Sequence, residues 1–390
     1  MMSKSLLGKA TEGKTLVTKI AVVIFSMLLV SCAQELEETP YFDISECRRI
    51  DLVNGQTGES IVGAEDFAID TLRDRLIISA YDRRRVENAA GKGAQSIPQG
   101  GVFSVSFSDL ITTGQRRLAV EPLIQPSSIS GGLRPHGISY QAATDEIIFI
   151  NRAYERRSSK KSSWQRVTRL EKVGGDGAIF MGDEKPIHCA ANDVFSDDGQ
   201  IWLSHDHSFC GWRAAFEDVF GLKKSGILTL SEKPSDLPHS VASNIQFANG
   251  LTQIDDITYA LAATREAQIV FYQKSENDFI EKSRFDVPGG PDNFLMTTEG
   301  TLTVAVHPSL MAMGLHRKLG IGTAPSRIVD VNYTKGTYRL LFDDVAGKLW
   351  SGATVAYAKD NWLAIGSATD EGILLCQKPY GNQSMGYSRS

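Results

Sequence analysis

Hydrophobic positions along this chain gather in short runs, and the spacing typical of an amphipathic helix is nearly absent. Representative runs are Leu76–Ala80, Ile201–Ser204, Gln268–Tyr272 and Trp362–Gly366, and most such runs are flanked by Gly, Asn or Asp. These flanking residues favour the tight turns that join antiparallel strands. The pattern therefore predicts an all-β fold.

A longer period overlies the strand pattern. A short motif with a polar residue beside a small or apolar one precedes a turn and another strand at Glu65-Asp66-Phe67, His136-Gly137-Ile138, Asn192-Asp193-Val194, Asn249-Gly250-Leu251, Asp292-Asn293-Phe294 and Ala353-Thr354-Val355. Six recurrences at this spacing are typical of propeller blades. We therefore expect a six-bladed β-propeller over residues 43–380 whose innermost strands bring the motifs together around a central channel.

The stretch 188–210 combines one of these motifs with a predicted hairpin, whose turn is 196–199. Asn192 and Asp193 provide hard oxygen donors, which suit Ca²⁺ better than zinc. Adjacent side chains of a strand point to opposite faces, so these two residues could serve two different ions. His205 and His207 share a strand face and give the alternative of a zinc site.

Composition narrows the class of protein. Thirty-five glycines agree with many tight turns, and 42% hydrophobic with 22% charged residues is ordinary for a globular protein. The net charge of −5, without a basic stripe, argues against a nucleic-acid partner. No change of composition after residue 43 marks a second domain.

The N-terminus has the pattern of a targeting segment, which we exclude from the fold. Lysines up to Lys19 precede an apolar run at 20–30, and the chain then reads Leu29-Val30-Ser31-Cys32. This resembles a bacterial lipobox, so we expect a lipoprotein signal peptide at 1–32 and a lipid anchor on Cys32. A plain signal peptide or an uncleaved anchor is the alternative. Residues 33–42 read as an acidic tether and 381–390 as a C-terminal tail.

Two segments interrupt the strand rhythm. Residues 152–166 form a basic, serine-rich stretch, which predicts a solvated hairpin tip or a contact with anionic lipid headgroups or sugars. Residues 211–224 have helical spacing, with Trp212, Phe216, Val219 and Phe220 on one side. We expect that helix to cap the channel mouth or to pack on the top of the propeller.

In this order, the motifs resemble those of the paraoxonases, the calcium-dependent arylesterase and lactonase family built on a six-bladed propeller. The matching stretches, between about Cys47 and Cys376, are Gly63–Asp66, Arg134–Ser139, Asn192-Asp193, Asp206-His207, Phe247–Gly250 and Asp292-Asn293. Each stretch is short, and the signal lies in their shared order.

The resemblance implies two calcium ions in the central channel. The ligands of the catalytic ion would be Glu65, Asn192, Asn249, Asp292 and Asn293, and those of the structural ion Asp66, Asp193 and the backbone carbonyl of Ile138. It also implies a disulfide between Cys47 and Cys376. Cys189 and Cys210 flank the predicted hairpin and could pair if their strands align.

The resemblance gives four candidate catalytic residues: His136 and His307 as bases, and Asp206 and His207 near the site mouth. One position departs from the family. The histidine that would form a dyad with His136 is replaced by Arg152, which stays charged and accepts no proton. Its charge would lower the pKa of a neighbouring imidazole, which favours neutral His136.

These observations predict a lipid-anchored, calcium-dependent hydrolase of lactones and aryl esters in the bacterial cell envelope. The metal would polarise the substrate carbonyl for attack by water. Two alternatives stay open: a non-catalytic propeller whose calcium rigidifies a cell-envelope binding surface, and a propeller enzyme of the gluconolactonase or strictosidine-synthase-like kind.

Overall fold

The computed structural model describes residues 36–112, 114–157, 160–178, 185–197, 199–230, 238–275 and 278–378. The chain divides into two units, residues 1–35 and 36–390, and the described residues all belong to the second. The predicted signal peptide, Cys32 and the C-terminal tail at 381–390 lie outside the described residues. Within these ranges no helix is long and apolar enough to cross a membrane.

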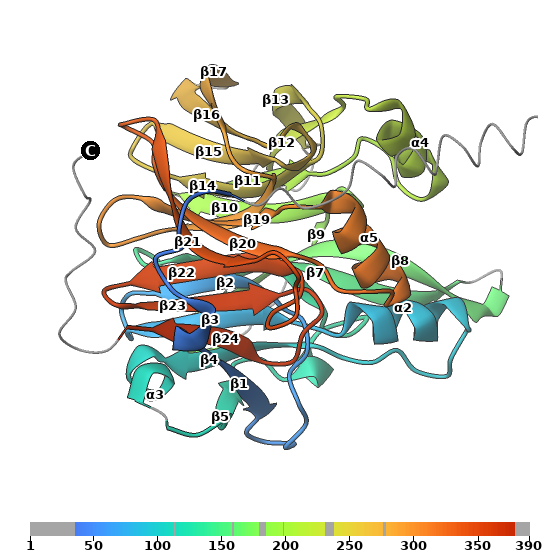
Figure 1. The fold of residues 1–390 in the computed structure, drawn as a ribbon. Helices are drawn as coiled ribbons and strands as arrows, with labels where there is room; N and C mark the ends of the chain where they lie inside the picture. Colours follow the sequence, from blue (N-terminus) through green and yellow to red (C-terminus); the bar gives the residue numbers. More distant parts are fainter. Residues whose placement is uncertain are drawn as a thin grey trace, which may run out of the picture. The chain divides into compact units, whose positions relative to one another are not determined.

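The described residues are mostly β-strand, as predicted (Figure 1). The strands are β1 (Cys47–Asn54), β2 (Ala64–Asp70), β3 (Arg75–Ala80), β4 (Gly101–Ser106), β5 (Arg117–Pro122), β6 (Pro135–Gln141), β7 (Glu146–Arg157), β8 (Lys160–Gly174), β9 (Lys185–Pro186), β10 (Ala191–Asp197), β11 (Gln200–His205), β12 (Ser225–Leu230), β13 (His239–Ile245), β14 (Ala248–Gln253), β15 (Thr258–Ala263), β16 (Gln268–Ser275), β17 (Asp278–Asp286), β18 (Gly290–Met296), β19 (Leu302–His307), β20 (Ser326–Asn332), β21 (Thr337–Asp344), β22 (Ala353–Lys359), β23 (Trp362–Ser367) and β24 (Ile373–Gln377). The helices are α2 (Arg83–Gly91), α3 (Phe107–Thr112), α4 (Trp212–Phe220) and α5 (Leu310–Leu319), with short 3-10 turns at Ile44–Glu46, Pro126–Ser128 and Thr264–Glu266.

The strands pair in chain order in four of the five sheets. Four sheets have four strands each, beginning at β6, β10, β14 and β18, and a fifth sheet has the order β2-β3-β4-β5-β1-β24-β23-β22. In that fifth sheet β1 pairs in parallel with β5 and antiparallel with β24. The N-terminal strand thereby joins the first group of strands to the last.

The first strands of these groups contact one another in a closed ring. The contacts run from β2 to β6, β10, β14, β18 and β22, and from β22 back to β2. Each first strand also has a register shift at its motif, where two residues oppose one on the next strand. Such β-bulges re-aim side chains and are common beside active sites.

Glycines allow the first strands to approach closely. A Cβ atom at Gly137 would lie 2.5 Å from Cα of Asp193, and one at Gly250 would lie 2.5 Å from the carbonyl oxygen of Asp292. Only glycine fits both positions without a backbone shift. The glycines of the His136-Gly137 and Asn249-Gly250 motifs are therefore explained by the packing of β6 on β10 and of β14 on β18.

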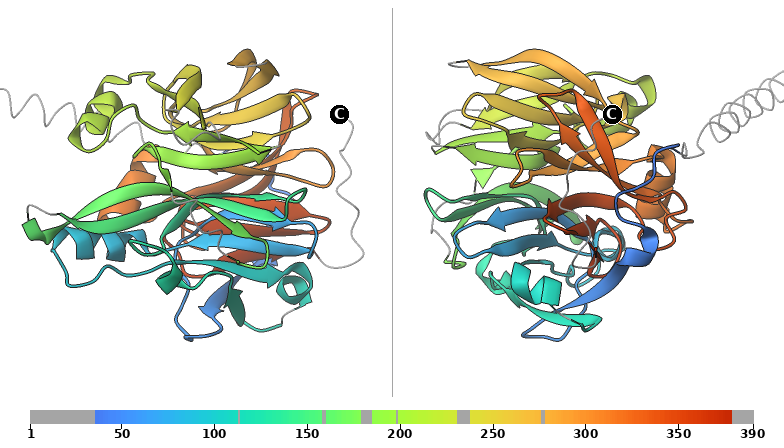
Figure 2. Two further views of the ribbon diagram at one scale, coloured as in Figure 1. Left: turned by 180° about the vertical axis from the view of Figure 1, so that it is seen from behind. Right: turned by 60° about the vertical axis from the view of Figure 1, so that its left-hand side comes forward.

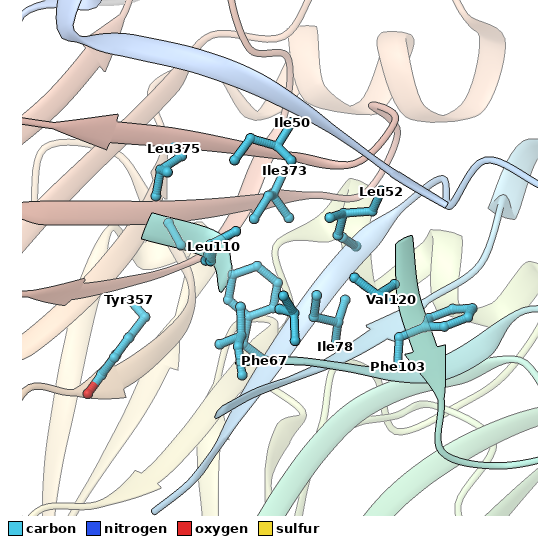
Figure 3. Close-up of a cluster of buried hydrophobic side chains, with 14 of the residues drawn as sticks. Ile50, Leu52, Phe67, Ile78, Phe103, Leu110, Val120, Tyr357, Ile373 and Leu375 are labelled. Carbon is cyan, nitrogen blue, oxygen red and sulfur yellow. The ribbon is translucent and has the colours of Figure 1, made fainter. Parts of the chain in front are cut away.

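Hydrophobic side chains fill the space between neighbouring sheets. The largest cluster among the described residues contains side chains from the strands β1 through β5, from α3 and from the strands β22 through β24. Figure 3 shows Phe67, Ile78, Tyr357 and Leu375 within it. Buried apolar area of this kind contributes about 25 cal/mol per Å². The cluster therefore packs the first and last strand groups together beside β1.

Both candidate cysteine pairs are bonded. The Cys47–Cys376 disulfide confirms the pairing implied by the family resemblance, and it links directly opposed residues of β1 and β24. The Cys189–Cys210 disulfide spans the hairpin of β10 and β11. Disulfides are typical of proteins that fold in an oxidising compartment.

Helix α4 forms within the predicted segment, but its apolar side does not pack on the sheets as expected. Trp212, Phe216, Val219 and Phe220 are 71%, 54%, 78% and 64% exposed. The buried residue of α4 is Glu217, whose carboxylate accepts hydrogen bonds from the backbone of Ser208 and Phe209 and from the Ser208 hydroxyl. Polar contacts to the preceding loop therefore fix the helix. In Figures 1 and 2, α2, α4 and α5 lie at the same end of the sheets, opposite α3.

Candidate functional site

A cavity of about 260 Å³ lies where the first strands meet the three helices. One motif residue from each first strand lines it: Glu65, His136, Asn192, Asn249, Asp292 and Thr354. Further lining residues come from α2, α4 and α5, and from Asp206, His207 and His307 at or just after strand ends. The structure therefore brings most of the predicted site residues together, although they lie far apart in the sequence.

Consecutive motif residues are placed in different surroundings, as the alternation of side chains along a strand predicts. Glu65 and Asn192 line the cavity, whereas Asp66 and Asp193 are buried beside the neighbouring first strands. Asn293 is also buried, and its amide donates to the carbonyl of Glu65 at 3.4 Å. The division agrees with the predicted ligand sets for Glu65, Asn192, Asp66 and Asp193, whereas Asn293, predicted as a ligand of the catalytic ion, does not line the cavity.

We call Asp66, Asp193 and the carbonyl of Ile138 the buried set. Its two carboxylates hold neighbouring strands together. Asp66 accepts hydrogen bonds from the backbone N–H groups of Phe67 and Ile138, both at 2.9 Å. Asp193 accepts from those of Val194 and Leu251, both at 2.7 Å. Each carboxylate thus ties its own strand to the next one in the ring.

The two buried carboxyl groups also affect each other. Burial raises the pKa of Asp66 well above its usual range, and the charge of Asp193 raises it further. Burial likewise raises the pKa of Asp193, with the N–H donors opposing it. Two buried carboxylates that repel one another are the donors that a hard divalent cation would neutralise, so these residues fit the predicted structural calcium. The N–H of Ile138 faces Asp66, and its carbonyl is the predicted third ligand.

We call the predicted ligands that line the cavity, Glu65, Asn192, Asn249 and Asp292, the cavity set. Three of them form a chain of polar contacts. The Asn192 amide donates to Oδ1 of Asn249 at 2.7 Å, the Asn249 amide donates to Asp292, and Oδ2 of Asp292 lies 2.8 Å from Nε2 of His307. The chain of contacts therefore places these side chains next to one another on the cavity wall. Carboxylate and amide oxygens are the ligands that calcium prefers.

A buried arginine shares this wall. Arg83, the first residue of α2, forms an ion pair with Oε1 of Glu65. The other oxygen, Oε2, is buried and has no hydrogen-bond partner. Oε2 accepts no hydrogen bond, although Nδ1 of His136 lies 3.0 Å from it, so Glu65 can still join the amides and Asp292 around an ion. The residues therefore fit the predicted catalytic calcium, with Arg83 as a competing cation.

His136 is held by the same arginine. Its Nδ1 lies 2.6 Å from Nη2 of Arg83 and 3.0 Å from Oε2 of Glu65. Burial lowers the pKa of His136 well below its usual value, and the charges of Arg152 and Arg83 lower it further. The expected effect of Arg152 is therefore present, although burial is the larger cause. Because an arginine only donates, Nδ1 acts as an acceptor and its lone pair is engaged.

His307 has the opposite arrangement. Its Nε2 faces the Asp292 carboxylate, and its Nδ1 is buried without a hydrogen-bond partner. A carboxylate that accepts the proton of one ring nitrogen leaves the other nitrogen as a free lone pair. Of the two predicted bases, His307 is therefore the one whose orienting partner is in place.

Asp206 and His207 line the outer part of the cavity. His207 lies between two carboxylates, with Nδ1 2.8 Å from Asp206 and Nε2 3.0 Å from Asp218. Burial opposes its protonation, but these two hydrogen bonds prevail and raise the pKa of His207 to about 9. His207 is thus an imidazolium at neutral pH and connects the end of β11 to α4.

The zinc alternative has less support. Nδ1 of His205 lies 3.1 Å from the carbonyl of His207, and burial lowers the pKa of His205. Within the described ranges, no three His, Cys, Asp or Glu side chains are grouped so that they could hold a metal ion.

Three residues that line this site were given no role in it from the sequence. Arg83 belongs to the run Asp82–Arg85, which reads as an exposed basic stretch although Arg83 is only 9% exposed. Arg166 belongs to the stretch expected to form a solvated hairpin tip or to contact lipid headgroups or sugars, but the β7–β8 hairpin brings it to the cavity wall. Thr354 belongs to the sixth motif, and its hydroxyl donates to the Glu65 carbonyl at 2.7 Å. Nothing in the sequence indicated that Arg83 would be buried within its basic run.

Comparisons with known proteins give structural neighbours only. No family model matches the chain, and no curated protein matches its sequence. One similar solved structure is a proposed gluconolactonase from a structural-genomics consortium, at 14% identity and a TM-score of 0.49, covering 89% of this chain and 97% of that chain. Another is the PQQ-bound aldose sugar dehydrogenase of Streptomyces coelicolor, at 10% identity and a TM-score of 0.46, covering 85% and 97%. A third is a luciferin-regenerating enzyme, at 16% identity and a TM-score of 0.39, covering 65% and 93%. The paraoxonase resemblance therefore rests on the motifs.

Proposed function

We propose that this protein is a calcium-dependent hydrolase of lactones and aryl esters, built as a six-bladed β-propeller in which β1 joins the first and last blades. The observation that carries the proposal is the cavity lined by one motif residue from each of the six first strands. These residues supply carboxylate and amide oxygens beside two histidines, which is the chemistry required to polarise a carbonyl and to activate water.

The residues that would hold the ions follow from the two ligand sets. Asp66, Asp193 and the Ile138 carbonyl would hold the structural ion. The catalytic ion would be held by Glu65, Asn192, Asn249, Asp292 and Asn293. When bound, calcium would supply Lewis-acid polarisation of the substrate carbonyl, which is worth several kcal/mol in the transition state.

The chain's own residues would move the proton. His307, with Nε2 held by Asp292, would accept a proton from water at Nδ1 and return it to the leaving oxygen. His136 would contribute less, because Arg83 engages its Nδ1 lone pair. Leu310 and Met313 of α5 line the same cavity and would exclude bulk water from the acyl group.

The second candidate function is a non-catalytic binding module. The contact of Arg83 with both Glu65 and His136 favours it, because one guanidinium occupies a proposed ligand and a proposed base together. A panel of lactones and aryl esters, assayed with calcium and with a chelator, separates the two. Hydrolysis that requires calcium supports the enzyme, whereas bound calcium without hydrolysis of any panel member supports the binding module.

The proposal places the protein on the bacterial cell envelope through a lipid anchor at Cys32. Its support is the apolar run followed by Leu29-Val30-Ser31-Cys32, together with the two disulfides. Two acyl chains give stable anchoring where one does not. The Cys32→Ser variant is expected to leave the membrane fraction or to keep its signal peptide, and unchanged processing with membrane retention would refute the anchor.

A further inference from the structure

More basic than acidic side chains line the cavity. Five acidic side chains line it, and each is paired with a basic or histidine side chain: Glu65 with Arg83, Glu87 with Arg317, Asp206 with His207, Asp218 with Arg265, and Asp292 with His307. Arg152, Arg166 and Lys318 also line the cavity, and in the described part of the chain none of them has a carboxylate partner. The cavity therefore holds positive charge that the surrounding residues do not balance.

Two of the three unbalanced positive charges belong to Arg152 and Arg166, which are neighbours in the sheet. They lie on adjacent strands, where Arg152 of β7 opposes Thr168 and Arg166 is two residues from Thr168 on β8. Diagonal neighbours of this kind share a sheet face and lie within reach of long side chains. The charge of Arg152 is the main cause that lowers the pKa of Arg166, with burial as the second cause.

Backbone carbonyls place both guanidiniums near the proposed reaction centre. Nη2 of Arg152 lies 3.5 Å from the carbonyl of Ala191, and Nη2 of Arg166 lies 3.2 Å from the carbonyl of Cys189. Ala191 precedes the proposed calcium ligand Asn192. Nε of Arg152 and Nε of Arg83 are both buried without a hydrogen-bond partner. The Arg83 residue as a whole is only 9% exposed.

We propose that Arg152 and Arg166 bind an anionic group of the substrate, so that the preferred substrate is a lactone or ester carrying a carboxylate or phosphate close to the scissile carbonyl. The inference rests on the proposed hydrolase function and names its substrate class. Guanidinium groups bind carboxylate and phosphate oxygens through paired, charge-assisted hydrogen bonds. An anion between them would also relieve their mutual repulsion.

A matched pair of substrates tests this. The lactone of 2-hydroxyglutarate carries a free carboxylate on the ring, and its primary carboxamide is a neutral analogue of nearly the same shape. Ring opening of both is followed by proton NMR. Wild-type protein is expected to show a kcat/KM roughly 10-fold or more higher for the carboxylate, the range of one charge-assisted contact. Arg152→Gln and Arg166→Gln should bring the ratio of the two kcat/KM values toward one, mainly by raising KM for the carboxylate.

Arg117→Gln is the control, because Arg117 is an exposed residue of β5 that does not line the cavity. It should keep the full preference. Arg166 is exposed, so Arg166→Gln serves as the second variant if Arg152→Gln does not fold. Equal rates for the carboxylate and the carboxamide in wild-type protein would overturn the inference while leaving the hydrolase proposal intact.

A binding measurement separates this inference from the proposed function. Glutarate and inorganic phosphate are titrated calorimetrically into wild-type protein and the Arg152→Gln and Arg166→Gln variants at low ionic strength. Binding that either variant weakens at least about tenfold supports the anion site even if no lactone is hydrolysed, and the tighter probe identifies carboxylate or phosphate. Absence of binding to both probes, or binding that both variants retain, would contradict the site.

Discussion

Nη2 of Arg83 lies 2.6 Å from Nδ1 of His136, while the same guanidinium is paired with Glu65. An arginine is always charged and has no acceptor, so the imidazole nitrogen that faces it acts as the acceptor. One side chain at the start of α2 therefore engages both a proposed calcium ligand and a proposed base. Several properties of the site depend on this contact.

The first consequence is weakened calcium binding at the cavity set. The Arg83→Gln variant removes a positive charge beside Glu65 and is expected to bind calcium at least about tenfold more tightly, since charges this close interact by more than 1 kcal/mol even at an effective dielectric of about 20. Isothermal titration calorimetry measures the change. Arg85→Gln on the exposed side of the same helix is the control and should bind as wild type does. An affinity that is unchanged or lower in Arg83→Gln would show that this arginine does not compete with the ion.

The two proposed bases should differ in importance. His307→Gln is expected to lower kcat by about 10²–10⁴-fold, the usual contribution of a general base. His136→Gln should lower it by less than about tenfold, because Arg83 already engages its lone pair. The exposed His239→Gln gives the background for a histidine replacement. Equal loss of kcat in His136→Gln and His307→Gln would assign His136 a role that its contacts in this structure do not indicate.

The two ligand sets should also separate in stability measurements. Calcium at 100 times its dissociation constant should raise the free energy of unfolding by about 2.7 kcal/mol per site. Glu65→Gln alters the cavity set and should keep the calcium-dependent rise in Tm that comes from the buried set. Asp193→Ala should lose that rise. A Tm that responds to calcium equally in both variants would argue against a buried ion at Asp66 and Asp193.

His207 should make stability depend on pH in the alkaline range. Its pKa is raised to about 9 in the folded protein by the hydrogen bonds to Asp206 and Asp218, against burial. A raised pKa contributes stability that is fully present below the unfolded value of about 6.5 and is lost as pH rises through about 9, in total roughly 3 kcal/mol. Thermal unfolding of wild type and His207→Gln between pH 6 and pH 10 tests this. The difference in unfolding free energy between them should shrink as pH rises, and a constant difference would contradict the ion pairs.

Local pattern was sufficient to predict the strands and the convergence of the motifs. The short apolar runs with Gly, Asn and Asp between them correspond to strands such as β3, β11, β16 and β23. The opposite surroundings of Asn192 and Asp193 follow from strand alternation, which needs no tertiary information. The Cys47–Cys376 disulfide was accessible only through the family resemblance, because nothing local to either cysteine selects its partner.

The sequence could not show which side chains of a segment are buried by contacts with other elements of the fold. Arg83 and Arg85 are neighbours in one basic run, yet only Arg83 is buried against Glu65 and His136. The apolar residues of α4 have the spacing of a core-facing helix, yet they are exposed because Glu217 is the residue that anchors it. In both segments the deciding partner comes from another element, so periodicity within the segment carries no information about it.

The measurement that tests the central claim most directly is kcat/KM for one good lactone as a function of free calcium, in wild type and in Asn249→Ala. The account predicts a saturable rise with calcium, loss of turnover on chelation, recovery on adding calcium back, and at least about tenfold weaker calcium dependence in Asn249→Ala, which lacks one proposed ligand oxygen. Turnover that persists unchanged in excess chelator, or protein that binds calcium and hydrolyses no lactone or ester, would contradict it.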